Sequence, residues 1–165
     1  MASHRARRLR FTMQTPAAYR RLRAQYAAAH LWPAPQLALP VPPTRVARVH
    51  ARDVVLSPSH TPGRHRLRID PQHRILFNHP VDHVPGMLLL EVARQAAHHL
   101  QHPEPIVPIG MDCRFHRYLE LHVPCWIDTR QLPRTTLAFQ QNSTPHFTGT
   151  LTHQHLDSAS STWHG

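Results

Sequence analysis

The hydrophobic and polar positions divide the chain into several short segments of strand character and one long segment without a strand period. The short segments are rich in β-branched or aromatic residues and are bounded by Pro, Gly, Asn or Ser. They predict strands over 52–56, 64–69, 123–130, 135–140 and 146–153, with a less regular strand over 115–121. The long segment, 84–101, predicts a helix, because Pro85 suits its first turn and Pro103 ends it. One long helix among antiparallel strands indicates an α+β domain in which the sheet wraps the helix.

The helix predicted over 84–101 has two different faces when its residues are placed about 100° apart. One face is apolar and includes three alanines that would allow close approach to a sheet: Leu89, Val92, Ala93, Ala96, Ala97 and Leu100. The other face carries a polar stripe: Glu91, Arg94, Gln95, His98 and His102. The first turns are apolar on nearly all sides, so this end should be buried, where Glu and Arg are costly unless paired or functional. A functional stripe is therefore preferred to one that simply meets water.

A second helix and a linker precede the strands. Thr15 is placed to cap a helix whose first position is Pro16, and the residues that follow are tolerable helix formers. Five prolines between positions 33 and 43 predict a semi-rigid extended linker. We therefore expect a basic helical arm and linker over 1–43, one domain over 44–155 and a tail over 156–165.

The charge of the chain is concentrated at its start. Nineteen arginines, with no lysine, oppose nine acids and give a net charge of +10, and ten of those arginines precede the first acid, Asp53. Such an arm could bind a polyanion or an acidic protein. Few aromatics accompany the arginines and no docking motif is present, so nucleic acid is not favoured. No apolar run approaches the roughly 20 residues of a membrane helix. The two cysteines form no disulfide framework, which fits a cytoplasmic protein.

Residues 79–95, with the sequence HPVDHVPGMLLLEVARQ, resemble the signature of the AfsA-type A-factor biosynthesis proteins. Segments 52–57, 66–70, 114–120 and 124–127 are similar to further family segments in the same order, and 16–23 resembles the connector before the family's second repeat. The resemblance implies a single hot-dog fold, in which an antiparallel sheet wraps one long helix. Family members usually carry two such repeats, and this chain resembles only the C-terminal one. It is therefore expected to form a homodimer or to pair with a separate hot-dog half.

The resemblance also implies an activity in γ-butyrolactone signal synthesis. A β-ketoacyl group passes from an acyl carrier protein thioester to the primary hydroxyl of dihydroxyacetone phosphate. The reaction needs a base, donors to the oxyanion, a cation for the phosphate and a channel for the acyl chain. The alternatives are a hot-dog acyl-thioester dehydratase or thioesterase, and a non-catalytic acyl-binding half-protein.

Four candidate site residues lie on the predicted helix. Glu91 matches the catalytic carboxylate of related hot-dog dehydratases, five residues after Gly86, and partial burial would raise its pKa. Arg94 could hold that carboxylate or meet a phosphate, and its alternative is a structural ion pair with Glu91. Gln95 shares the stripe and is a candidate for substrate binding. Backbone N–H groups near Gly86 could polarise a thioester carbonyl.

The remaining candidates flank the helix in sequence. His79 and His83 could each approach the thioester, and Asp82 could orient His83 or cap the helix. Arg117, on a predicted strand, could meet the phosphate, although an exposed strand arginine is the simpler interpretation. His98 and His102 have no third ligand nearby, so no metal site is expected. The sequence contains no Gly-rich phosphate-binding loop, so no nucleotide cofactor is expected, and no other cofactor is predicted.

Overall fold

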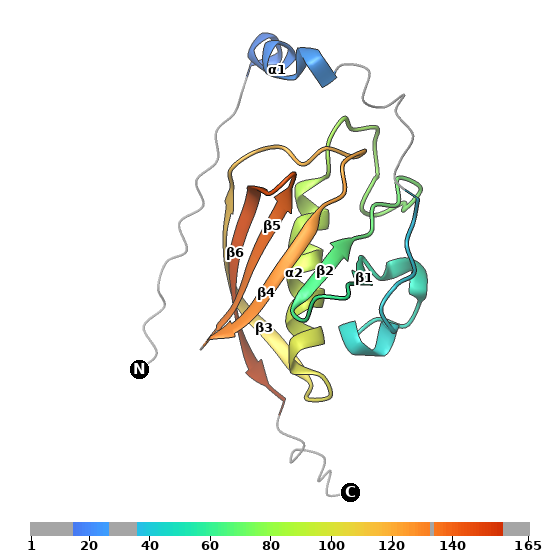
Figure 1. The fold of residues 1–165 in the computed structure, drawn as a ribbon, viewed down its shortest axis with the longest axis vertical. Coiled ribbons are helices and arrows are strands. Elements are labelled where there is room, and N and C mark those ends of the chain that lie inside the picture. Colours follow the sequence, from blue (N-terminus) through green and yellow to red (C-terminus); the bar gives the residue numbers. More distant parts are fainter. Residues whose placement is uncertain (1–14, 27–35, 133, 157–165) are drawn as a thin grey trace, which may run out of the picture.

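A six-stranded antiparallel sheet curls around one long helix in the computed structural model, which describes residues 15–26, 36–132 and 134–156. The helix is α2 (Gly86–Gln101), and Figure 1 shows it lying along the concave face of the sheet. The strand order is β1-β2-β4-β5-β6-β3. The strands are β1 (Leu56–Pro58), β2 (Arg64–Leu67), β3 (Ile106–Phe115), β4 (Trp126–Leu132), β5 (Arg134–Gln141) and β6 (Thr144–His155). This confirms the expected α+β arrangement of a sheet wrapped around one helix.

The contact between helix and sheet forms the core. The alanine-rich face of α2 is completely buried at Val92, Ala93 and Ala96, as its small side chains predicted. Opposite them, Phe139 of β5 and Phe147 of β6 are also fully buried, and their rings meet edge to face with centroids 4.6 Å apart. Small residues on the helix thus make room for large ones on the sheet.

The predicted strands over 64–69, 123–130, 135–140 and 146–153 are present as β2, β4, β5 and β6 with shifted ends. The strand predicted over 52–56 is wrong at its start, where the short 3-10 helix η4 (Ala51–Asp53) lies instead. The reason is a side chain of α2. The Gln95 amide accepts from the Val55 N–H at 3.0 Å and donates to the Asp53 carbonyl at 2.7 Å, so these backbone groups need no neighbouring strand.

The strand predicted over 115–121 is also wrong, because the strand in this region is β3, which ends at Phe115. β3 was not predicted from the sequence because it contains Pro108 and Gly110, which are unusual within a strand. Its pairing with β6 shifts register between these two residues. The irregularity is tolerated because β3 is an edge strand of the sheet.

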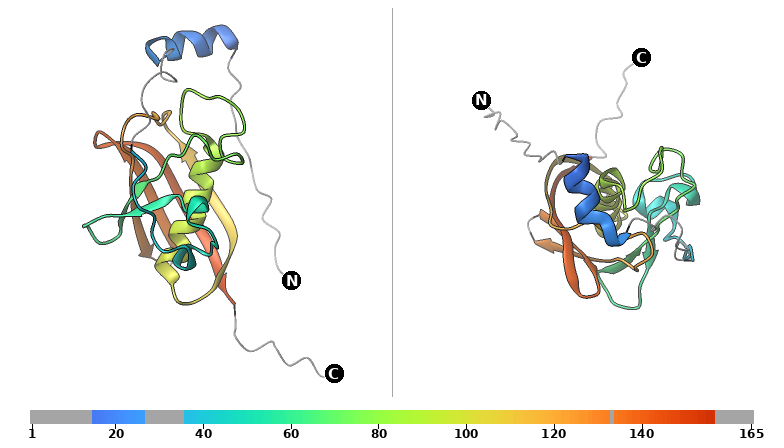
Figure 2. Two further views of the ribbon diagram at one scale, coloured as in Figure 1. Left: turned by 90° about the vertical axis from the view of Figure 1, so that its right-hand side faces the viewer. Right: turned by 90° about the horizontal axis from the view of Figure 1, so that it is seen from above.

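The arm helix α1 (Pro16–Arg23) begins as predicted, with the Thr15 hydroxyl accepting from the Ala18 N–H at 3.2 Å. It continues into the short 3-10 helix η1 (Ala24–Tyr26). Figures 1 and 2 show α1 across the end of the fold at which α2 begins. A further 3-10 helix, η3 (Pro43–Val46), packs beside α2. Within the described ranges, no helix is long and apolar enough to cross a membrane.

Candidate active site

The first polar cluster gathers around the Glu91 carboxylate on α2. Its Oε1 accepts from Arg48 Nη2 and Gln95 Nε2, both at 2.6 Å, and from Arg94 Nη2 at 2.9 Å. Oε2 accepts from Arg94 Nε at 2.9 Å. Arg94 also donates to the Val46 carbonyl of η3 at 3.2 Å. The ion pair that the sequence left open as the alternative for Arg94 is therefore present, and it ties α2 to the segment before β1.

These contacts reverse the expected titration of Glu91. Burial alone would raise its pKa, since the side chain is only 14% exposed. Hydrogen bonds from Arg94, Gln95 and Arg48 outweigh burial and hold the pKa below its ordinary value. The predicted rise in the pKa of Glu91 is therefore wrong, because the sequence does not reveal that the carboxylate meets two guanidinium groups. Near neutral pH Glu91 is an ionised, fully engaged anion.

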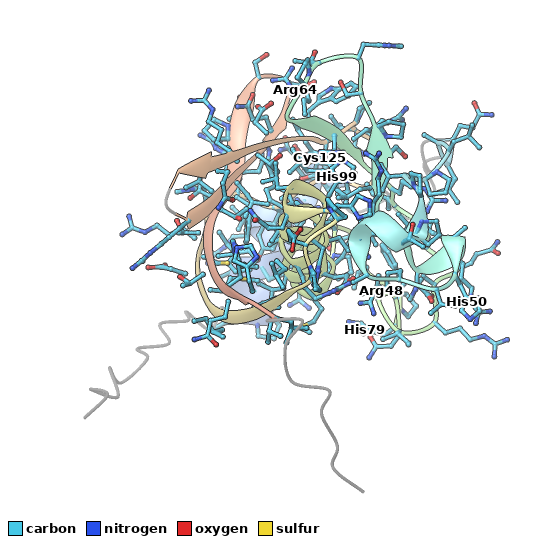
Figure 3. All side chains as sticks on the ribbon, turned by 90° about the horizontal axis from the view of Figure 1, so that it is seen from below. Arg48, His50, Arg64, His79, His99 and Cys125 are labelled. Atoms are coloured by element: carbon cyan, nitrogen blue, oxygen red, sulfur yellow. The ribbon has the colours of Figure 1, made fainter. Side chains whose placement is uncertain are left out.

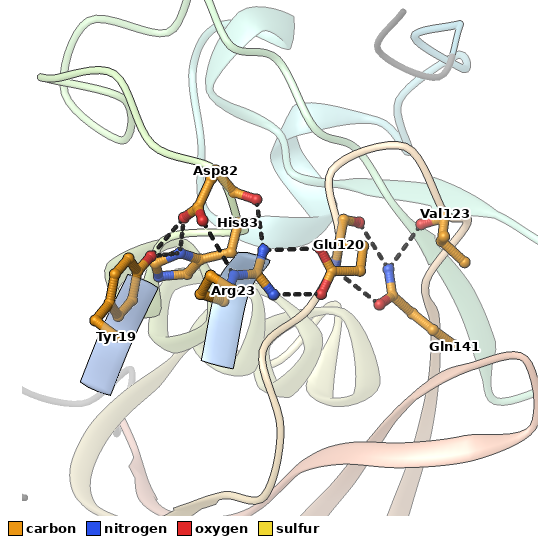
Figure 4. A network of polar contacts seen from close by, with 7 residues as sticks. All are labelled: Tyr19, Arg23, Asp82, His83, Glu120, Val123 and Gln141. Carbon is orange, nitrogen blue, oxygen red and sulfur yellow. Dashed lines mark hydrogen bonds and ion pairs between the residues drawn. The ribbon is translucent and has the colours of Figure 1, made fainter. Parts of the chain in front are cut away.

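The second polar cluster contains Asp82 and His83, just before α2 begins, and is drawn in Figure 4. Asp82 Oδ1 lies 2.7 Å from His83 Nδ1 and accepts from the Tyr19 hydroxyl of α1 at 2.6 Å. Burial would raise the pKa of Asp82, but hydrogen bonds from Tyr19, His83 and Arg23 lower it to about 2. A carboxylate can only accept, so His83 Nδ1 carries the proton of this contact, and in the neutral imidazole Nε2 is the acceptor.

Arg23 of α1 joins this cluster to the loop after β3. Its side chain is 4% exposed and donates to Asp82 Oδ2 at 3.0 Å and to both oxygens of Glu120 at 2.6 and 2.9 Å. The guanidinium carbon also lies 4.3 Å from the Tyr26 ring centre and 5.0 Å from that of Tyr118. Burial opposes the charge of Arg23, yet the hydrogen bonds that it donates to Glu120 and Asp82 raise its pKa above the ordinary value. Arg23 is therefore a buried, paired cation.

The other predicted site residues lie apart from these contacts. His79 is exposed at the periphery of the molecule, with Nδ1 2.6 Å from the side-chain oxygen of its neighbour Asn78. Arg117 is exposed in the loop after β3, not on a strand. Gly86 is exposed as the first residue of α2, and a Cβ there would lie 3.6 Å from the Phe115 ring. Gln95 is fully buried, and both its amide protons and its oxygen are engaged.

No group of three or more His, Cys, Asp or Glu side chains in the described part of the chain could hold a metal ion. The candidates thus separate into two clusters. Asp82 and His83 stand together, joined by two residues of the arm, whereas Glu91, Arg94 and Gln95 stand together, joined by Arg48. Both clusters lie beside the first half of α2.

The comparison with known proteins agrees with this fold. The family described as the A-factor biosynthesis hotdog domain matches residues 32–156. The chain belongs to this family. A relative from Streptomyces virginiae, named 2-oxo-3-(phosphooxy)propyl 3-oxoalkanoate synthase, is 47% identical over 124 residues, which make up 74% of this chain and 41% of that protein.

Further relatives of this hotdog family chain carry the same name. Those from Streptomyces griseus and Streptomyces coelicolor are 46% and 48% identical, with matches that cover 76% and 75% of this chain and 43% and 38% of the relatives. The chain therefore spans about two fifths of the length of these relatives.

Sequence reasoning missed the arm and Arg48 as parts of these clusters. Tyr19 and Arg23 are four residues apart on a helix, which places them on one face, and this spacing was an available signal. Arg48 carried no such signal, because it lies 43 residues before Glu91 in an irregular segment (Figure 3).

Proposed function

We propose that this chain supplies one hotdog unit of an acyltransferase that moves a 3-oxoacyl group from a carrier-protein thioester to the primary hydroxyl of dihydroxyacetone phosphate. The family and the name shared by the Streptomyces relatives support the substrates, because that name describes the phosphorylated ester this reaction would make. The observation that carries the proposal is the Asp82–His83 contact at 2.7 Å, which prepares an imidazole nitrogen to accept a proton beside the start of α2.

In the proposed step, His83 Nε2 takes the proton of the substrate hydroxyl while its oxygen bonds to the thioester carbonyl carbon. The tetrahedral intermediate then breaks its carbon–sulfur bond, and the departing thiolate receives the proton from His83. The products are the ester and the free carrier thiol, and His83 returns to its starting form. Asp82 keeps Nδ1 protonated throughout and compensates the positive imidazolium.

The oxyanion of this intermediate needs donors. The first N–H groups of α2, those of Gly86 and Met87, donate to no acceptor among the described residues, and the helix has no side-chain cap. They are backbone donors at the positive end of the helix dipole. Gly86 is exposed and lacks a side chain, so a thioester carbonyl could approach closely. Arg117, exposed and adjacent in sequence to the Tyr118 ring that packs on His83, is our candidate for the phosphate.

Glu91 has a different role in this proposal. Its lowered pKa and its engagement with Arg48 and Arg94 suit a group that holds α2 against the preceding segment rather than a proton acceptor. We therefore expect Glu91→Gln to lower the turnover less than removal of His83 does, and to leave the acid limb of the rate–pH profile in place. Steady-state kinetics across pH measure both. Disappearance of the acid limb in Glu91→Gln would transfer the role of base to Glu91.

A second hotdog unit completes the site in our proposal. Two hollows in the described residues have volumes of about 10 Å³ each, room for about one water molecule and not for an acyl chain. The outer edge of β3 pairs with no strand in the described part of the chain, and Val107 and Phe115 on β3 are 41% and 57% exposed. Such an edge favours pairing with a second copy or with a separate half. The acyl channel would then lie between the two units.

Val107→Lys tests this association. A lysine on an edge strand opposes strand addition, so the native mass should fall from that of a dimer to the 19.0 kDa of one chain. Native mass spectrometry measures it at a protein concentration at which the parent chain associates. Ala138→Lys, at a half-buried position of the inner strand β5 where both β4 and β6 pair with it, adds the same charge away from the edge and should keep the dimer. Equal masses for Val107→Lys and the parent would contradict pairing along β3.

An acidic carrier protein suits the exposed arginines Arg20 and Arg21 of α1 and Arg45 of η3. The basic residues expected at positions 5–10 lie outside the described residues. The decisive experiment incubates the purified full chain with a 3-oxoacyl carrier protein and dihydroxyacetone phosphate, and follows products by mass spectrometry. Formation of the phosphorylated ester supports the proposal. Free acid or loss of water from a 3-hydroxyacyl thioester would favour a thioesterase or dehydratase, and acyl binding without turnover a non-catalytic unit.

A further inference from the structure

The arm helix α1 contacts Asp82 and Glu120 through the polar groups of two residues, Tyr19 and Arg23. Tyr19 and Arg23 both reach Asp82, but they bind different oxygens of its carboxylate. Arg23 takes Oδ2, on the side of Glu120, whereas Tyr19 takes Oδ1, the oxygen that also receives His83 Nδ1–H (Figure 4). The two arm residues therefore have different effects on the imidazole.

Arg23 already accounts for the attachment of the arm. It is buried, it binds both oxygens of Glu120, and it donates to the Asp82 backbone carbonyl at 2.8 Å as well as to the side chain. Each of its three nitrogens donates within the protein and the side chain is only 4% exposed, so Arg23 is poorly placed to bind a substrate phosphate. Tyr19 makes a second, separate contact with this cluster. Its hydroxyl lies 2.6 Å from Asp82 Oδ1 and 3.3 Å from His83 Nδ1.

We propose that α1 is part of the catalytic unit and that Tyr19 is a positioning residue, which shares Asp82 Oδ1 with His83 and thereby limits the affinity of His83 for a proton. The proposal rests on the proposed function only in its final consequence, the pH at which the enzyme works. A hydroxyl that donates to Oδ1 withdraws negative charge from the same lone pairs that the imidazole N–H uses. Without it, Asp82 stabilises the imidazolium more strongly.

The surroundings of His83 leave few other groups that could produce such an effect. From α1 it faces Tyr19 and, through Asp82, the Arg23 cation. From the loop after β3, the Tyr118 ring lies edge-on at 4.6 Å between centroids, and Glu120 lies beyond Arg23. The first turn of α2 contains no acidic residue. Burial and the hydrogen bond to Asp82 raise the pKa of Tyr19 to about 12, so its hydroxyl keeps its proton over the working range.

Tyr19→Phe tests the inference, because the ring and its contacts with His83 and Tyr118 remain while the hydroxyl is lost. NMR titration of the full chain, with the His83 imidazole assigned by comparison with His83→Gln, should show its midpoint moving upward by about half to one pH unit. Gln25→Ala, at an exposed and uncharged position of the arm in η1, should leave that midpoint unchanged. If the enzyme is active, the acid limb of the rate–pH profile moves with the NMR midpoint.

The experiment distinguishes a failure of the role inferred for Tyr19 from a failure of the proposed reaction. An unchanged His83 midpoint in a folded Tyr19→Phe variant overturns the role of Tyr19, whatever the activity of the parent chain. A midpoint that shifts upward in a parent chain without transferase activity supports the role of Tyr19 and contradicts only the proposed reaction. A fall in rate with an unchanged midpoint would make Tyr19 a structural contact of the arm.

Discussion

Replacing His83 with alanine should lower the rate of the proposed acyl transfer by about 10²- to 10⁴-fold, the usual contribution of a positioned general base. The chain should remain folded, because His83 contacts its neighbours through one ring nitrogen and ring edges and is not part of the buried core. Single-turnover measurement of ester formation separates this loss in chemistry from a change in substrate binding.

His79→Ala is the informative comparison, since both histidines were candidates from the sequence. His79 is exposed and its one described side-chain contact is with its neighbour Asn78, so its loss should change the rate little. His60→Ala, at an exposed loop position, serves as the neutral reference. A large loss in His79→Ala with normal rates in His83→Ala would reverse the assignment of the base.

Replacing Arg23 with alanine should lower the free energy of unfolding by roughly 3–5 kcal/mol, the effect of removing one partner from a buried ion pair. The substitution leaves Glu120 and Asp82 without their shared cation, and the Glu120 side chain is only 10% exposed. Urea denaturation followed by circular dichroism measures the change.

The matched control for Arg23 is Arg20→Ala on the same helix, which removes an equal charge from an exposed side chain. That change should stay within about 0.5 kcal/mol. Arg23→Lys should recover only part of the loss, because an ammonium cannot make the paired contact with both Glu120 oxygens. A loss for Arg23→Ala no larger than that for Arg20→Ala would mean that the arm is not anchored at this cluster.

The fold was predictable where its signals are local. The apolar face of α2 and the bounded strands from β4 to β6 repeat at the spacing of their own secondary structure, so the sequence alone predicts them. The loop after β3 was misread because side chains fix it: Gln141 of β5 exchanges hydrogen bonds with the backbone N–H and carbonyl of Glu120, each at 2.8 Å. Because this loop is held by an amide far away in the sequence, its own composition resembles that of a strand and does not reveal the loop.

The candidate site, like the fold, was predictable only where its residues are close together in the sequence. Glu91 and Arg94 lie one helical turn apart, so their pairing was one of the alternatives that the sequence left open, and Asp82 is adjacent to His83. Arg23 and Tyr19 reach Asp82 across 59 and 63 residues, a distance along the chain that no periodicity spans. The sequence therefore singles out the two carboxylates and Arg94, but not Arg48, Arg23 and the Tyr19 hydroxyl, which also influence the ionisation of those carboxylates.

The cluster at the arm also has an unequal charge count. One guanidinium, that of Arg23, faces the two carboxylates of Asp82 and Glu120, which leaves a surplus of one negative charge while the imidazole is neutral. In the proposed reaction, this cluster becomes electrically neutral when His83 takes the hydroxyl proton, and it regains one negative charge when the departing thiolate takes that proton. The negative charge that would compensate the imidazolium is thus present before the proposed proton transfer, which would therefore need little reorganisation of the cluster.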